Sequence, residues 1–295
     1  MAVEAIPNDR ALDENIGRMP SGRVSGPDGW TRELVKAING DTKTVILHMV
    51  NYMLTGGNIG KADIGSICPL QKCERRTRPI ALMNFLRKCS EAWVAYHTTR
   101  LINDLKLLDP SQFGFILSGG CPQPIFIVNA LMEWAMKNDE QLYLILLDAT
   151  EAYNSVPFEV IALAFRRMGA TNTYLAYIWG LLQNQKWKLN SAYGPVEQDP
   201  LTPEAGVPQG GPLSPLIYII AMDLINSHLR IHQKKGTGVR MQHAQFQMNE
   251  EIVSLSYADD LTLLTDTFEK CQNLLNLACE IFAFIGIKIN PTKTV

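Results

Sequence analysis

The segment "SYADDLTLLT" at Ser256–Thr265 places two adjacent aspartates, Asp259 and Asp260, within a run of alternating apolar and polar residues. That alternation predicts two short strands joined by a tight connection at Ala258–Asp260. Asp is common in turns, so a solvated turn is the simplest interpretation. Two neighbouring carboxylates repel each other, however, unless a cation or a proton neutralises them. The other acidic and basic residues of the chain therefore decide how this hairpin is interpreted.

The composition is that of an ordinary globular protein. The chain has 295 residues, 46% of them apolar and 19% charged, which suits about two domains or one large domain with subdomains. Apolar runs such as Leu142–Leu147 are far too short to span a membrane, and the N-terminus lacks a signal-peptide pattern. The six cysteines form no C-x-x-C pair, which argues against zinc. We expect reduced thiols and an intracellular location, nuclear or cytoplasmic.

The net charge of −2 conceals a basic block at Lys72–Arg100, where seven basic and two acidic residues leave a local charge of +5. Such a block is either a solvated face or a surface that binds phosphates. Within "QKCERRTRPIAL" (Gln71–Leu82), Lys72 and Arg78 are candidates for holding a triphosphate, because Arg forms bidentate phosphate contacts and Lys supplies a compact charge.

The spacing of apolar residues predicts a chain of helices interrupted by a few strands. Residues 1–25 lack periodicity and are expected to form a flexible lead-in. The expected helices are at residues 31–54 (two short helices broken at 39–41), 86–105, 157–168, 174–183, 214–229 and 267–284. The mixture indicates an α+β fold in which the strands cluster around the aspartates.

A third carboxylate, Asp148, follows the apolar run Leu142–Leu147, which is typical of a buried strand. A helix cap or a turn is the simpler role for an aspartate at a strand end. Together with Asp259 and Asp260, however, Asp148 would supply three hard oxygen ligands of the kind that Mg²⁺ prefers. Two such ions would bind the attacking and leaving oxygens of a phosphoryl transfer, and would remove the repulsion within the aspartate pair.

Two further segments carry unusual residues. "AGVPQGGPLSP" (Ala205–Pro215) has three glycines and three prolines before an expected helix, so its backbone can approach a flat ligand closely. A tight turn alone is the alternative. "GIKINPTKT" (Gly286–Thr294) offers Lys288 and Lys293 near the C-terminus.

In this order, the segments resemble the catalytic core of reverse transcriptases, most closely those of non-long-terminal-repeat (LINE-type) retrotransposons. The resemblance covers nearly the whole chain, about Gly26 to Val295. Its motifs are "SGPDGW" (25–30), "RPIAL" (78–82), "QFGF" (112–115), "LLDATEAYNSVP" (146–157), "GVPQGGPLSP" (206–215), "YADD" (257–260) and "GIKINPTKT" (286–294).

The resemblance implies catalytic roles for four residues. Asp148, Asp259 and Asp260 would bind two Mg²⁺ ions, for which Mn²⁺ could substitute. Lys293 would protonate the pyrophosphate leaving group, and a solvated surface lysine is its alternative interpretation.

It also implies substrate contacts. Tyr153 stands where the family has the aromatic residue that excludes a ribose 2′-hydroxyl. Gln209 and Gly210 would lie against the incoming base and the template, with Lys72 and Arg78 on the triphosphate.

The fold implied is that of the fingers and palm of a right-hand polymerase, with an antiparallel palm sheet backed by helices. We expect fingers at 1–90 and 157–208, and palm at 91–156 and 209–295. The sequence ends at Val295, just past the last palm lysine, so we expect the thumb to be absent.

The function implied is that of an RNA-directed DNA polymerase. Its partners would be an RNA template, a DNA primer and deoxynucleoside triphosphates, and not a membrane. Asn154 departs from the family, which usually has Asp there. An RNA-dependent RNA polymerase is one alternative, disfavoured by the bulky Tyr153. A non-catalytic, nucleic-acid-binding remnant of a retroelement is another, disfavoured because all three carboxylates are retained.

Overall fold

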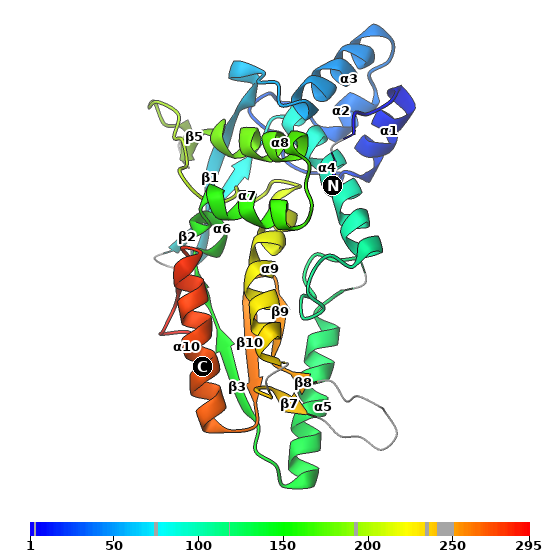
Figure 1. Cartoon of the computed structure of the whole chain (residues 1–295). Helices are drawn as coiled ribbons and strands as arrows, with labels where there is room; N and C mark the ends of the chain where they lie inside the picture. Colours follow the sequence, from blue (N-terminus) through cyan, green and yellow to red (C-terminus); the bar gives the residue numbers. More distant parts are fainter. Residues whose placement is uncertain (3, 74–75, 118, 192–193, 234–235, 241–250) are drawn as a thin grey trace. The chain divides into compact units, whose positions relative to one another are not determined.

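The computed structural model describes residues 1–295 except 3, 74–75, 118, 192–193, 234–235 and 241–250 (Figure 1). The chain divides into two compact units. Unit 1 comprises Met1–Leu101 and Phe165–Ile217, and unit 2 comprises Ile102–Ala164 and Tyr218–Val295. Helices and strands occur in both, which confirms the α+β class. Within the described residues, no helix is both long and apolar enough to cross a membrane.

The expected helices form, with ends that shift by a few residues. In unit 1 a break at 37–40 separates α2 from α3, close to the expected 39–41, and Thr31 caps α2 by accepting a hydrogen bond from the Leu34 amide. Three helices contribute to both units, namely α4, α7 and α9. The bounds are α2 Arg32–Lys36, α3 Asp41–Leu54, α4 Phe85–Leu105, α7 Phe158–Arg167, α8 Asn172–Gln183 and α9 Ser214–Gln233, with a 3-10 turn, η1, at Gly60–Asp63.

The expectation of a flexible lead-in at residues 1–25 was wrong, because this segment contains helix α1 (Asp9–Arg18). Asn8 caps the helix through its side chain, and Leu12 and Ile16 are fully buried one turn apart. A stripe of only two apolar residues is too short to stand out as periodicity, although it is enough to fix one face of a helix against a core.

Unit 1 also contains a four-stranded sheet in the order β2-β1-β5-β6, so the expectation that strands cluster around the aspartates was incomplete. Strand β1 pairs antiparallel with β2 and parallel with β5, and β5 pairs antiparallel with β6. Pro69 lies within β1, and a proline inside a run argues against a strand when only the sequence is considered. The bounds are β1 Ile64–Cys73, β2 Arg76–Leu82, β5 Lys186–Ser191 and β6 Gly194–Pro195.

The "SGPDGW" segment holds the start of α4 in unit 1. The Asp28 carboxylate accepts hydrogen bonds from the amides of Phe85 (2.7 Å) and Trp30 (3.3 Å). In return the Asn84 side-chain oxygen accepts from the Asp28 amide at 3.2 Å. An acceptor at the first turn of a helix satisfies an amide that has no partner within the helix, so this motif has a structural explanation.

Unit 2 is built on a three-stranded antiparallel sheet in the order β3-β10-β9. Helix α10 contacts β3 and β10, and α5 contacts β9 (Figure 1). The bounds are α5 Pro122–Asn138, β3 Tyr143–Leu147, α6 Ala152–Ser155, β9 Ser254–Tyr257, β10 Asp260–Thr265 and α10 Phe268–Phe284, with the short pairs β4 (Ala149–Thr150) with β11 (Lys288–Ile289) and β7 (Val239–Arg240) with β8 (Glu251–Ile252).

Strand β3 forms where expected but is not buried as predicted, since Leu147 is buried whereas the Leu146 side chain is 53% exposed. The strand lies at the edge of its sheet. Its outer backbone edge pairs with the end of the chain, where the Leu146 amide donates to the Val295 carbonyl (2.8 Å) and the Val295 amide donates back (3.1 Å). Side chains project from the faces of a sheet, so this pairing covers the backbone of the edge strand but not the Leu146 side chain.

A first prediction concerns the core beneath this sheet, where Leu264 is fully buried with Leu131, Val239 and Leu255. Leu264→Ala should lower the free energy of unfolding by about 2–5 kcal/mol, because it removes buried apolar surface and leaves a cavity. The matched control is Leu146→Ala on the neighbouring strand, which should cost less than about 1 kcal/mol. Denaturant unfolding measures both values, and equal losses would contradict this description of the core.

Candidate active site

The hairpin expected around the aspartates is confirmed, with Ala258 and Asp259 forming a two-residue turn between β9 and β10. Asp260 is the first residue of β10 and pairs with Tyr257. Ala258 is buried and has φ of 58°. This left-handed conformation is uncommon for any residue but glycine, so the surrounding structure must hold the turn.

The pairing of β3 with β10 brings two of the three aspartates together. The ladder ends where Leu147 pairs with Leu261, and Asp148 and Asp260 are the residues next to that last pair. Asp259 precedes Asp260 in the turn. All three aspartates therefore lie at the same end of the sheet.

Lys293 is the fourth predicted catalytic residue, and it lies against Asp148. Its ammonium nitrogen is 2.9 and 3.1 Å from the two carboxylate oxygens. The segment that carries it is held by β11, which pairs with β4, and by a hydrogen bond from the Asn290 amide to the Asp148 carbonyl (2.8 Å). Lys293 thus supplies a positive charge to one of the three carboxylates.

The three aspartates fit a hard divalent cation by the chemistry of their carboxylate oxygens. Among the described residues, no three His, Cys, Asp or Glu side chains are already grouped to hold one ion. The carboxylate of Asp148 instead faces Lys293.

Tyr153 lies in the short helix α6, five residues after Asp148. Its ring stacks on that of Tyr218, with 4.6 Å between centroids and 11° between planes. Burial raises the pKa of both phenols, and the negative charge of Asp259 raises them further. Both rings therefore stay neutral and within electrostatic reach of the turn. Tyr218 carried no sequence signal, because it lies in an apolar run of α9 where any large residue would fill the core.

Gln112 was identified only as part of "QFGF", but the structure places it directly behind the turn. Its side-chain oxygen accepts hydrogen bonds from the backbone amides of Ala258 (2.9 Å) and Gly114 (2.8 Å). Sequence reasoning missed this role, because no pattern joins residues 146 positions apart.

In unit 1, the loop that contains Gln209 and Gly210 lies on strand β2. The Gln209 carbonyl accepts from the Ala81 amide at 2.7 Å, and Gln209 bridges to Ile80. Gly210 has φ of 117°, and a Cβ there would lie 2.8 Å from the Ala81 carbonyl oxygen. The glycine is therefore needed for the loop to lie on the strand that also carries Arg78.

Strand β5 alternates between exposed lysines and a buried tryptophan. Lys186 and Lys188 are exposed, whereas Trp187 packs with Ala81 and Met83 on the opposite face. Sequence reasoning missed these lysines, although the alternation Lys-Trp-Lys is the signal of a strand that is buried on one face only.

Arg78 shares a face with these lysines. Arg78 pairs with Leu70, and Lys188 pairs with Ser66, four residues earlier on β1. An even separation along a strand puts both on the same side of the sheet. We call Arg78, Lys186 and Lys188 the basic sheet face. Lys72 lies in β1, but its side chain is outside the described part of the structure.

The predicted +5 block is only partly available to phosphates. Arg87 is 2% exposed and pairs with Glu91 at 2.9 Å and with Asp63 at 3.4 Å. It also donates to the Leu181 carbonyl at 3.0 Å. A buried, paired guanidinium serves the core of unit 1, so the prediction was wrong for this residue.

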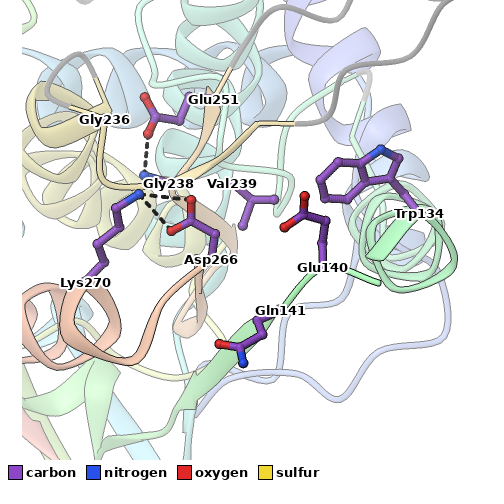
Figure 2. A pocket seen from close by; sticks show the side chains of 9 residues that line it. All are labelled: Trp134, Glu140, Gln141, Gly236, Gly238, Val239, Glu251, Asp266 and Lys270. Atoms are coloured by element: carbon purple, nitrogen blue, oxygen red, sulfur yellow. Dashed lines mark hydrogen bonds and ion pairs between the residues drawn. The ribbon is translucent and has the colours of Figure 1, made fainter. Parts of the chain in front are cut away.

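A pocket of about 490 Å³ in unit 2 is separate from the aspartates (Figure 2). Its polar lining includes Glu140, Glu251 and an ion pair between Asp266 and Lys270 at 2.8 Å. Asp266 follows the last residue of β10, so it lies about 20 Å along the strand from Asp260. The pocket therefore contributes nothing to the aspartate site.

Comparison with known proteins identifies the relatives of the chain. The family model described as reverse transcriptase (RNA-dependent DNA polymerase) matches residues 68–295. A Pol polyprotein of the type-2 retrotransposable element R2DM from Drosophila melanogaster is 26% identical over 289 residues, which are 95% of this chain and 25% of the relative. A Pol polyprotein of a type-1 element R2 from Nasonia vitripennis is 29% identical over 272 residues, which are 92% and 25% respectively. The chain thus spans about a quarter of the length of these non-LTR relatives.

Solved structures share the fold. Apo telomerase from Candida tropicalis, truncated from its C-terminal domain, superimposes with a TM-score of 0.55 at 16% identity, over 80% of this chain and 50% of that one. Telomerase from Candida tropicalis in complex with the TWJ fragment of telomeric RNA gives a TM-score of 0.56 at 14% identity, over 90% and 48% respectively. At these identities the likeness concerns the fold alone.

A second prediction follows from the buried tyrosine pair. An unfolded tyrosine ionises near pH 10, whereas burial keeps Tyr153 and Tyr218 protonated above that value. The unfolded state then binds fewer protons than the folded state, so stability is full below pH 10 and falls as the pH rises further. Tyr218→Phe should make the loss between pH 9 and pH 11 smaller, as measured by urea unfolding. Tyr52→Phe, at an exposed position, should leave it unchanged. An unaltered pH dependence in Tyr218→Phe would contradict the prediction.

Proposed function

The chain belongs to the reverse transcriptase family, and we propose that it carries the polymerase centre of a non-LTR retrotransposon protein. The reaction is RNA-directed DNA synthesis, in which a deoxynucleotide is added to a primer 3′-hydroxyl and pyrophosphate is released. The observation that carries the proposal is that Asp148 and Asp260 adjoin the last pair of the β3–β10 ladder, beside the turn that holds Asp259. The partners are an RNA template, a DNA primer and deoxynucleoside triphosphates.

In this proposal unit 2 acts as the palm and unit 1 as the fingers. The chain passes from one unit to the other at residues 102, 165 and 218. The sequence motifs predicted that it passes between fingers and palm at residues 91, 157 and 209. The predicted and observed boundaries differ by 8 to 11 residues. Each observed boundary falls inside a helix, α4, α7 or α9, whose first part belongs to one unit and whose last part belongs to the other.

The acidic residues would hold the cations. Asp148, Asp259 and Asp260 would bind two Mg²⁺ or Mn²⁺ ions, which would lower the pKa of the primer hydroxyl and stabilise negative charge on the oxygens of the transferred phosphoryl group. Lys293 leaves Asp148 for the pyrophosphate, where it donates a proton to the leaving oxygen. Its side chain is 44% exposed, so this movement breaks no buried packing.

The remaining predicted residues orient the nucleotide. The ring of Tyr153, backed by Tyr218, lies beneath the sugar and leaves no space for a 2′-hydroxyl. Gln209 and Gly210 present the backbone of their loop to the base and the template. The basic sheet face, together with Lys72, binds phosphates by charge and therefore without base preference.

A third prediction tests the proposal directly. Asp259→Asn keeps the shape of the side chain but removes its charge, so nucleotide addition should fall on the order of 10³-fold, since metal stabilisation supplies several kcal/mol. The matched control is Asp266→Asn at the other end of the same hairpin, which should keep the parental rate. The measurement is deoxynucleotide incorporation on an RNA template with a DNA primer, with circular dichroism to show that both variants fold. Parental activity in Asp259→Asn would refute the proposed centre and favour a nucleic-acid-binding role.

A fourth prediction separates DNA from RNA synthesis. Tyr153→Ala should admit ribonucleotides while deoxynucleotide addition persists, so discrimination should shift by about 10²-fold or more. Tyr143→Ala removes an aromatic ring at the far end of β3 and should leave discrimination unchanged. The measurement is kcat/KM for matched deoxy- and ribonucleotides. A parent protein that prefers ribonucleotides would overturn the proposed reaction, whereas unchanged discrimination would remove only Tyr153 from the sugar site.

A further inference from the structure

The turn that carries Asp259 has a backbone conformation that its own residues do not favour. Its first residue, Ala258, has φ of 58°, whereas two-residue hairpin turns use glycine at positions of positive φ. Ala258 is also buried, so water cannot satisfy its amide. The protein must therefore provide both a hydrogen-bond acceptor for that amide and a steric support for the turn.

Gln112 provides the acceptor. Its side-chain oxygen lies 2.9 Å from the Ala258 amide and 2.8 Å from the Gly114 amide. Both partners are N–H donors, which fixes the orientation of the side-chain amide with its oxygen toward the turn. Gln112 is 1% exposed, and its Nε2 makes no hydrogen bond within the described residues. The side chain therefore serves as an acceptor.

Backbone contacts keep the segment around Gln112 against β9. The Phe113 amide donates to the Ser256 carbonyl, and the Ser256 amide donates to the Ser111 carbonyl, each at 2.8 Å. Gly114 allows the closest approach, because a Cβ there would lie 2.6 Å from the Ala258 nitrogen. These contacts place the Gln112 oxygen against the turn without a flexible intermediate.

We infer that Gln112 is a positioning residue that sets the direction of Asp259, the residue next to Ala258. The inference rests on the proposed function, because it assigns the turn a role in holding the reacting groups. Gln112 itself touches no substrate. Fixing the Ala258 amide fixes the start of the Asp259 backbone, and hence where its carboxylate points relative to Asp148 and Asp260.

The test uses two variants and a matched control. Gln112→Met keeps the length of the side chain but removes the acceptor. Gln112→Glu retains an oxygen acceptor in either protonation state and loses no donor contact, since Nε2 makes none. Gln185→Met alters another glutamine that is 1% exposed, whose amide donates to the Leu182 carbonyl in unit 1.

Two measurements are made on the full chain. Hydrogen exchange of the Ala258 amide should become at least about 10-fold faster in Gln112→Met and stay near the parental rate in Gln112→Glu and Gln185→Met. In primer extension, Gln112→Met should lower kcat on the order of 10²-fold with little change in KM for the nucleotide, because misplaced groups slow the reaction after binding. Gln112→Glu should recover most of that loss.

The outcomes are separable. Unchanged Ala258 exchange in Gln112→Met would overturn the inference whether or not the chain polymerises. Faster exchange with parental kcat would overturn it too, because the turn would then be held for folding only. A parent that does not extend a primer would refute the proposed function, and with it the positioning role.

Discussion

The antiparallel register of β3 and β10 is the constraint on which the rest of the site depends. Because the pairing ends at Leu147 and Leu261, the residues next to that last pair are two aspartates, Asp148 and Asp260, at the same end of the sheet. A shift of one residue would turn one of these carboxylates to the other face of the sheet. Bringing Asp148 and Asp260 together has an electrostatic cost, which Lys293 offsets in the arrangement seen here by binding Asp148. In the proposed function, divalent cations would take the place of this ammonium at the carboxylates.

The two ends of the β9–β10 hairpin have different physical characters. At the far end, Leu264 packs with Leu131, Val239 and Leu255 in a fully apolar cluster. At the near end, the turn has a left-handed alanine supported from behind by Gln112. Strain of this kind persists only where the surrounding structure stabilises it. The apolar cluster at the far end and the pairing with β3 supply that stability, so the turn at the near end can keep its unfavourable conformation.

Those parts of the fold and of the candidate site that depend on residues close together in the chain could be predicted from the sequence. The turn at Asp259, the strand before Asp148 and most of the helices each depend on neighbouring residues. Features that depend on distant contacts could not be predicted. The sheet of unit 1 joins β1 to β5 across more than a hundred residues, and Pro69 obscures its longest strand. The roles of Gln112 and the exposure of β3 likewise follow from which segment packs alongside, and apolar patterning carries no such information.

The central claim is that Asp148 and the Asp259–Asp260 pair form one cation site. It is tested most directly by titrating the protein with Mn²⁺ and observing paramagnetic broadening of backbone amide signals. The account predicts that residues 147–149 and 258–261 broaden together at the same Mn²⁺ concentration, and that Asp148→Asn weakens the effect at both segments. Broadening confined to the acidic pocket around Glu251 and Asp266, or broadening at 258–261 that is unaffected by Asp148→Asn, would contradict it.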